Sequence, residues 1–329
     1  MAATVNEIAE KCGVSRTTVL RALNGTGSVK PETKDRILEA AQELNYRPNL
    51  LARSLNHGRT MSIGVEAINI ENLYFVSQLD AINRTAIKNG YFASIAVCDE
   101  NPKEERKLIQ GLCDRQMEGL IISPTGSGED FIRFLKSLEI PVVCIGNYVS
   151  DDFTTVMVNE RTAARDAFIH MHEKGYQRIV FVCPLLEDKN AQNIYAHLER
   201  YNGVKDACKE LSLDPDIIGN QNYLEKVDEV LNDGQNVRTG FLCSGYGYAL
   251  EIISDEAKKG RNIPNDFGIM GFDDLSILRY ITPGLTTVDT NAEGVAATAV
   301  KELISAIEDE DYEPKSVILK HKIIDRETL

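Results

Sequence analysis

The stretch TVNEIAEKCGVSRTTVLRALNG, residues 4–25, has the pattern of two short helices joined by a tight turn. Thr4 and Glu7 form a capping-box pair, in which each side chain can bond to the other residue's backbone N–H. Gly13 permits the sharp turn, and Ser15 can cap the second helix. This order of elements predicts a helix-turn-helix unit.

Apolar residues within this stretch repeat at helical spacing. The second helix leaves Arg16, Thr17 and Arg21 on its outer face. An arginine can bridge O6 and N7 of guanine, and a threonine can bond to a base edge or touch a thymine methyl. The pattern therefore favours a helix that reads the major groove, with a solvated surface helix as the alternative. The predicted inward positions are Val5, Ile8, Ala9, Val14, Val19 and Leu23.

The next segments predict a third helix and a hinge. Pro31 fits the first turn of the third helix, and Pro48 is expected to stop it. Asn49 can then begin a short helix that ends before Gly58. Its apolar residues are too many for a lone exposed helix and too few to fold alone, so it is expected to order only against a partner. The inward positions predicted are Ile37, Leu38, Ala41 and Leu44 in the third helix, and the apolar hinge residues are Leu50, Leu51 and Leu55.

Charge is distributed unevenly along the 329-residue chain. The whole chain has 36 basic and 50 acidic side chains, whereas residues 1–60 contain nine basic and six acidic ones. A small basic head on an acidic body favours a nucleic-acid-binding module whose body is held away from the duplex. The seven cysteines are scattered without a Cys-x-x-Cys pair, the N-terminus lacks a signal-peptide pattern, and no apolar run could span a bilayer. These features predict a cytoplasmic protein with reduced thiols.

From Met61 onward, short apolar strands alternate with amphipathic helices. This rhythm predicts an α/β core of two doubly wound parallel-sheet lobes, in which ligands bind beyond the carboxyl ends of the strands. The predicted strands lie within 61–68, 91–98, 117–124, 140–147, 178–184, 239–245, 267–273 and 285–290, and helices are predicted at 75–89, 103–115, 160–174, 196–211 and 246–259.

The order and spacing of these motifs resemble the lactose-repressor (LacI/GalR) family of bacterial transcription regulators. The head and hinge carry the resemblance first, and the body extends it through GYQRIVFV (175–182), LERYNGV (198–204), GIMGFDD (268–274), PGLTTVD (283–289) and IIDRETL (323–329). The resemblance implies a helix-turn-helix domain at 1–48, a hinge helix and linker at 49–60, and a periplasmic-binding-protein-like effector core at 61–329. Lobe one is expected at about 61–160 and 291–322, and lobe two at about 161–290 and 323–329.

The family pattern also implies which residues touch DNA. The expected wedge is Leu55, which would open a base step in the minor groove and bend the duplex. Leu20 departs from the pattern, because the family usually has a serine there near a phosphate. The full implied DNA-binding set is Thr4, Ser15, Arg16, Thr17, Thr18, Arg21 and Asn24 in the head, and Asn49, Ala52, Arg53 and Leu55 in the hinge.

In the core, Arg200 and Asp273 match the family's ligand-gripping arginine and acid, and Phe272 occupies the adjacent aromatic position. A guanidinium and a carboxylate can bracket vicinal hydroxyls, and a ring can stack on a sugar. A surface salt bridge for Arg200 and a turn or helix cap for Asp273 are the alternatives. Three stretches around the expected pocket depart from the family pattern and add weaker lining candidates, namely Tyr74, Phe75, Asn147, Tyr148, Ser244 and Tyr246.

Together these features predict a sequence-specific transcription regulator, most simply a repressor, that binds a pseudopalindromic operator as a homodimer. Its operator affinity would be switched by a small-molecule effector, a sugar or sugar derivative. A nucleobase, a nucleoside or a partner protein as the effector, and a soluble sugar-binding protein, remain alternatives. No catalytic motif, metal-binding pattern or cofactor fingerprint occurs in the sequence, so we expect neither an enzyme nor a cofactor.

Overall fold

The computed structural model describes the chain as two compact units, Met1–Thr60 and Met61–Leu329. The predicted hinge helix lies almost wholly outside the described residues, which are 3–46, 59–99, 101–186, 193–219 and 222–329.

The head contains three helices, α1 (Val5–Cys12), α2 (Arg16–Asn24) and α3 (Pro31–Glu43). The capping box at α1 is confirmed, since both of its hydrogen bonds are present and Gly13 follows at φ 61°. Ser15 caps α2 by accepting from the Thr18 N–H at 3.1 Å. The helices pack around a small core in which Ile8, Val19 and Ile37 are fully buried. The predicted helix-turn-helix order is therefore confirmed.

The third helix differs from its prediction in two respects. Leu38 is 39% exposed, and Ala40 takes the inward place instead. The reason is geometric, because positions 37, 40 and 41 share one helical face while residue 38 lies about 100° around the axis. The helix also ends at Glu43, and Asn45 adopts the left-handed region at φ 49°. The third helix therefore ends before Pro48, the residue that was expected to stop it.

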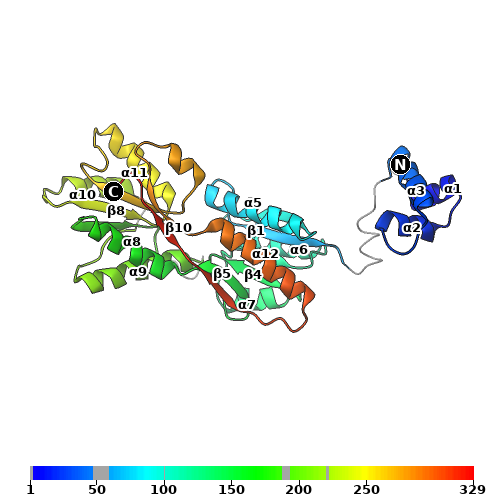
Figure 1. The fold of residues 1–329 in the computed structure, drawn as a ribbon. Coiled ribbons are helices and arrows are strands. Elements are labelled where there is room, and N and C mark those ends of the chain that lie inside the picture. The colour runs from blue at the N-terminus through cyan, green and yellow to red at the C-terminus, as the bar shows by residue number, and fades with distance from the viewer. Residues whose placement is uncertain (1–2, 47–58, 100, 187–192, 220–221) are drawn as a thin grey trace. The chain divides into compact units, whose positions relative to one another are not determined.

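The second unit is built on two six-stranded sheets (Figure 1). All eight predicted strands are present, and four short strands, β5, β7, β11 and β12, are additional. The first sheet has the order β11 (Ser316–Leu319), β5 (Thr154–Val158), β4 (Val142–Ile145), β3 (Leu120–Ile122), β1 (Ser62–Ala67), β2 (Phe92–Val97). The second has the order β12 (Lys322–Ile324), β10 (Thr286–Asp289), β9 (Gly268–Phe272), β8 (Thr239–Cys243), β6 (Arg178–Val182), β7 (Asp216–Ile218).

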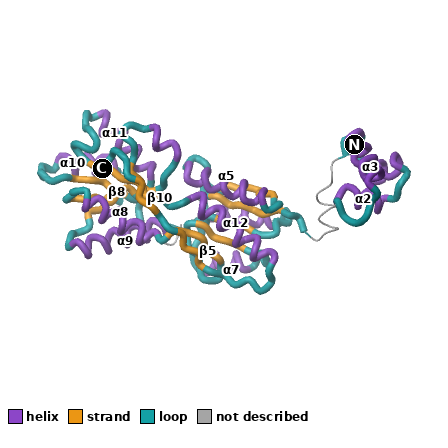
Figure 2. The backbone as a smooth tube through the Cα atoms, in the orientation of Figure 1, coloured by secondary structure: helices purple, strands orange, loops and turns teal. Residues whose placement is uncertain are grey.

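Helices cover both faces of each sheet, and we call each sheet with its helices a lobe (Figure 2). In lobe one, α5 and α12 pack on one face and α6 and α7 on the other. In lobe two, α8 and α9 cover one face and α10 and α11 the other. The bounds are α5 Leu73–Lys88, α6 Pro102–Cys113, α7 Glu129–Lys136, α8 Glu160–Glu173, α9 Tyr195–Leu211, α10 Tyr223–Asn232, α11 Tyr246–Lys258 and α12 Ala292–Glu308, with a 3-10 helix η1 at Ser276–Tyr280.

The chain passes between the lobes after β5, after β10, and between β11 and β12. Only residues 320 and 321 separate the last two strands, although these strands belong to different sheets (the red segment in Figure 1). All strand pairs are parallel except β10 with β12. Parallel strands place their carboxyl ends along one edge of a sheet, where open α/β folds bind ligands.

The crossing of α8 and α9 depends on Gly203. A Cβ at this position would overlap the backbone carbonyl oxygen of Arg161 on α8. We expect Gly203→Ala to force the helices apart and to lower the free energy of unfolding by about 3 kcal/mol, measured by urea denaturation. Gly247→Ala on α11 is the matched control, because its Cβ would meet no atom within 4 Å. It should stabilise the protein slightly, by about 0.5–1 kcal/mol. Equal effects of the two changes would contradict this account.

Candidate functional site

The outer face of α2 presents the predicted base readers. Arg16, Thr17 and Arg21 are all exposed, while Val19 and Ala22 on the opposite side of the helix are buried. The N-terminus of α2 is held by Ser15, so Arg16 and Thr17 project from a capped first turn, and Arg21 follows in the last turn of the same helix. A rigid, capped helix with two guanidinium groups and a hydroxyl on its free face suits the edges of bases in a major groove.

Several other residues of the head that were predicted to bind DNA make hydrogen bonds within the head itself. Thr4 and Ser15 are exposed and cap α1 and α2, and the Thr18 hydroxyl lies 2.9 Å from that of Ser15. Asn24, the last residue of α2, is half-buried. Leu20, which replaces the usual serine of the family pattern, is also half-buried on this helix. The hinge candidates Asn49, Ala52, Arg53 and Leu55 lie outside the described residues.

In the second unit, Arg200 on α9 is the centre of a buried network. Its Nε donates to Glu160 Oε2 at 2.7 Å, and Nη1 donates to the carbonyl oxygen of Ser244. Nη2 lies 3.9 Å from Asp273 Oδ1, and the guanidinium carbon lies 4.1 Å from the centre of the Phe272 ring. Arg200 is 6% exposed, so its ion pair is buried and is not the surface salt bridge considered as the alternative.

Asp273 follows β9 in a left-handed backbone conformation at φ 71°. Its Oδ1 accepts from the Thr290 hydroxyl at 2.8 Å. Burial raises the pKa of its carboxyl to about 6, although the charge of Arg200 and the Thr290 bond oppose the rise. Phe272 is fully buried, and the guanidinium of Arg200 lies over its ring. The sequence led us to expect a sugar stacked on this ring, but the guanidinium of Arg200 already covers that face of the ring.

Lobe one contributes Tyr74, from the first turn of α5. Its hydroxyl accepts from Gln78 Nε2 at 3.1 Å, and its ring meets the Phe75 ring edge-on with centroids 5.4 Å apart. Burial, followed by the negative charges of Asp273 and Glu160, raises the pKa of the Tyr74 phenol. A neutral phenol from one lobe thus stands beside the charged network of the other.

Ser244 and Tyr246 lie at the end of β8 and the start of α11. The Ser244 side chain is fully buried, and its Oγ lies 2.6 Å from His197 Nδ1. Burial and the nearby charge of Arg200 lower the pKa of His197 to about 3, so the imidazole is neutral. The Tyr246 hydroxyl accepts from the backbone N–H of Leu73 at 3.0 Å, which is a contact between the lobes.

Asn147 and Tyr148 follow β4 and contact the segment that begins α9. The structure therefore groups the nine effector candidates in two places. One group forms or borders the ion-pair network and consists of Arg200, Asp273, Phe272, Ser244 and Tyr74, with Phe75 and Tyr246 at its edge. Asn147 and Tyr148 lie at the beginning of the helix that carries Arg200.

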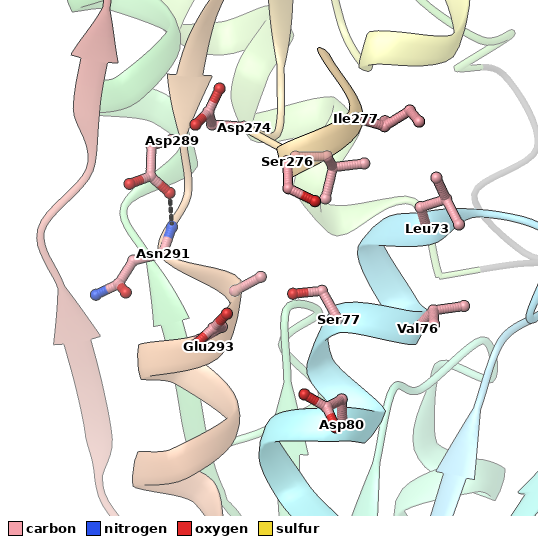
Figure 3. Close-up of a pocket in the computed structure, with 12 residues that line it drawn as sticks. Leu73, Val76, Ser77, Asp80, Asp274, Ser276, Ile277, Asp289, Asn291 and Glu293 are labelled. Atoms are coloured by element: carbon pink, nitrogen blue, oxygen red, sulfur yellow. Dashed lines mark hydrogen bonds between the residues drawn. The ribbon is translucent and has the colours of Figure 1, made fainter. Parts of the chain in front are cut away.

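A separate cavity of about 530 Å³ lies beside this network (Figure 3). The first turns of α5, the segment after β9 and the start of α12 line it. Its carboxylates are largely engaged, since Arg84 bonds to Asp80 and Glu293, and Arg326 bonds to Asp274. Asp289 accepts from the Asn291 N–H at 2.8 Å, the dashed line in Figure 3.

Known proteins share both parts of this architecture. Residues 4–49 match the family described as bacterial regulatory proteins, lacI family, and residues 168–329 match a periplasmic binding protein-like domain. The chain belongs to the LacI family of bacterial regulatory proteins. It is 28% identical to catabolite control protein A of Staphylococcus xylosus over 328 residues, covering 98% of each chain. It is also 28% identical to the ribose operon repressor of Halalkalibacterium halodurans, covering 99% of this chain and 96% of the relative.

The fold of this LacI-family protein agrees with a solved structure of the lac repressor dimer bound to operator and the anti-inducer ONPF. The TM-score is 0.87 at 20% identity, covering 100% of this chain and 99% of that one. Within its described residues, the LacI-family protein has no helix with the length and hydrophobicity needed to cross a bilayer.

Sequence reasoning missed three members of the site of this LacI-family protein. Glu160 opens α8 and looked like an ordinary acid in a first helical turn. Thr290 follows β10 in a run of threonines and carries no signal of its own. His197 could have been found, because it lies three residues before Arg200 on one predicted helix and so shares a face with it.

Proposed function

We propose that this protein represses transcription by binding a pseudopalindromic operator as a homodimer, and that a small molecule at the Arg200–Asp273 network controls its affinity. The observation that carries the proposal is the capped α2 with Arg16, Thr17 and Arg21 exposed on its free face. Two such heads would read half-sites in adjacent major grooves. The protein would act in the cytoplasm, beside the DNA, as a regulator and not as an enzyme.

A sugar or sugar derivative is the proposed effector class. Asp273 and Arg200 offer a carboxylate and a guanidinium at the carboxyl edge of the second sheet, and this pair can bracket neighbouring hydroxyls. A relative across nearly the full length is named a ribose operon repressor, which supports the same class. Calorimetric titration of the full chain with sugars, phosphosugars and nucleosides tests the proposal. Heat from nucleosides alone would reject a sugar.

The dimer surface is proposed on lobe one. Ile87, Phe92 and Ile95 are 61%, 67% and 50% exposed, on the last turn of α5 and on the edge strand β2. An exposed apolar group on an unpaired strand edge favours pairing with another chain. In this arrangement, closure of the lobes would alter the spacing of the two hinges. A coupling of about 1–3 kcal/mol between effector and operator would be sufficient for a switch.

The first experiment is selection from a random DNA pool by the purified full chain at moderate salt, followed by sequencing. An enriched palindrome with a flexible central step supports the regulator and supplies its operator. Binding that only fades with salt, even when metabolite extract is added, would reject sequence-specific regulation.

Arg16→Ala should weaken binding to the selected operator by about 1–3 kcal/mol and relax the preference at one base position. The physical reason is the loss of a guanidinium that bonds to a base edge. Fluorescence anisotropy with operators changed one base pair at a time measures both effects. Arg36→Ala on α3 is the control, since Arg36 is exposed outside the reading helix. A uniform loss across all sequences would reassign Arg16 to a phosphate contact.

A further inference from the structure

The segment that begins α9 belongs to lobe two but bonds to loops of lobe one. The Asn193 N–H donates to the carbonyl oxygen of Thr125 at 2.6 Å, and Asn193 Nδ2 donates to the Tyr148 carbonyl at 3.0 Å. The rings of Tyr148 and Tyr195 pack with centroids 5.7 Å apart. These contacts join the ends of β3 and β4 to the first turn of a helix from the other sheet.

Asn147 lies at the centre of these contacts and uses both ends of its carboxamide. Its Nδ2 donates to the carbonyl oxygens of Pro124 at 3.1 Å and Asn193 at 3.2 Å. Its Oδ1 accepts from the backbone N–H of Ala196 at 3.2 Å. One side chain of lobe one therefore bonds to a carbonyl and an amide of lobe two.

The bond to Ala196 has a structural meaning for α9. The first N–H groups of a helix lack partners within the helix and need an external acceptor. The residue before α9 is Ile194, which has no side-chain oxygen to supply one. Asn193 satisfies the N–H of Tyr195 at 3.1 Å, and Asn147 satisfies the next one from the opposite lobe.

We propose that Asn147 is a positioning residue that caps α9 across the lobe boundary, so that the Ala196 N–H at the start of the helix carrying Arg200 has this acceptor only when the lobes are closed. When the lobes open, these hydrogen bonds are replaced by hydrogen bonds to water. The first turn of α9, which contains His197, then loses the constraint that lobe one imposes on it. Closure and the placement of the Arg200 guanidinium are thereby linked. The consequence for effector response rests on the proposed function, whereas the capping itself does not.

The residue type at position 147 matters to this account. An aspartate could accept from Ala196, but its second oxygen would face the carbonyl oxygens of Pro124 and Asn193. Two acceptors at that distance repel each other and lose the donated bonds. Asn147→Asp should therefore fail to restore closure.

The test uses the full chain without DNA or effector. Hydrogen exchange measured by mass spectrometry follows the peptide at the start of α9. Spin labels at Glu129→Cys on α7 and Glu225→Cys on α10, in a Cys113→Ser background, report the distance between the lobes. Asn147→Ala removes two hydrogen bonds between the lobes, so the amide hydrogens of this peptide should exchange about tenfold faster in the variant. The distance between the two spin labels should also become longer or more broadly distributed. Asn147→Asp should behave in the same way.

Asn101→Ala is the matched control, because Asn101 caps α6 within lobe one by accepting from the N–H groups of Lys103 and Glu104. It should lower the melting temperature and leave both readouts of α9 unchanged. Unchanged exchange and distance in Asn147→Ala would overturn the proposal, as would wild-type behaviour of Asn147→Asp. Because neither readout involves operator or effector, this result is independent of the proposed function.

Discussion

Replacing Arg200 by methionine is expected to lower the free energy of unfolding by about 3–5 kcal/mol at pH 7. Arg200 is 6% exposed and balances Glu160 and Asp273, which are 5% and 7% exposed. Methionine keeps much of the volume over Phe272 but leaves two buried carboxylates without a counter-charge. Urea denaturation at pH 7 measures the loss. The loss should be smaller below pH 6, where the Asp273 carboxyl takes up its proton.

Two further variants separate lost charge balance from lost packing. Adding Glu160→Gln and Asp273→Asn to Arg200→Met removes the unbalanced charges and should recover most of the stability. Arg165→Met removes an arginine from an exposed pair with Glu210 and should cost about 0–1 kcal/mol. If the triple variant is no more stable than Arg200→Met alone, packing rather than charge governs the network.

Replacing Glu66 by glutamine is expected to stabilise the protein by about 5 kcal/mol at pH 9, on the 1.36 kcal/mol per pKa unit scale. Glu66 lies inside β1 with no exposed surface, and its Oε1 has no hydrogen-bond partner. Burial raises the pKa of this carboxyl to about 8, and the charge of Glu105 adds to the rise. Glutamine occupies the same space and never has to ionise.

The pH dependence follows from linkage. Between the ordinary glutamate pKa of 4.5 and about 8, the unfolded chain releases a proton that the folded chain keeps. Stability therefore falls across this window as pH rises, and the Glu66 contribution is fully lost above pH 8. Glu66→Gln should flatten that part of the profile and match the wild type near pH 4. The exposed control, Glu71→Gln, should leave the profile unchanged, and a parallel shift in both variants would exclude Glu66 as the cause.

Strands with continuous apolar runs were predictable, because a parallel strand buried on both faces needs them. Three of the four additional strands lack that signal, whereas β5 is buried along its whole length and could have been found. β11 alternates exposed and half-buried residues at the edge of its sheet, and β7 and β12 are only three residues long. Glu66 carried a readable signal that was overlooked, since it interrupts an otherwise apolar buried strand.

The only site residues that could be predicted were those whose type and position matched the family pattern. Arg200 and Asp273 follow from the resemblance, and the structure brings them to 3.9 Å. The partnership of Arg200 with Glu160 joins residues 40 positions apart on two helices, which no spacing rule relates. The role of Asn147 depends on a backbone N–H of the other lobe, and backbone groups are invisible in a residue pattern.

The buried thiols give each folded part of this protein its own reporter of local opening. Cys12 lies in the head, Cys144 in lobe one and Cys243 in lobe two, and all three are buried without a disulfide. Burial also raises the pKa of the Cys144 and Cys243 thiols, which suppresses the reactive thiolate. An alkylating reagent can therefore modify each site only during transient exposure. Site-by-site labelling rates would rank the opening free energies of the three parts in one unmodified chain.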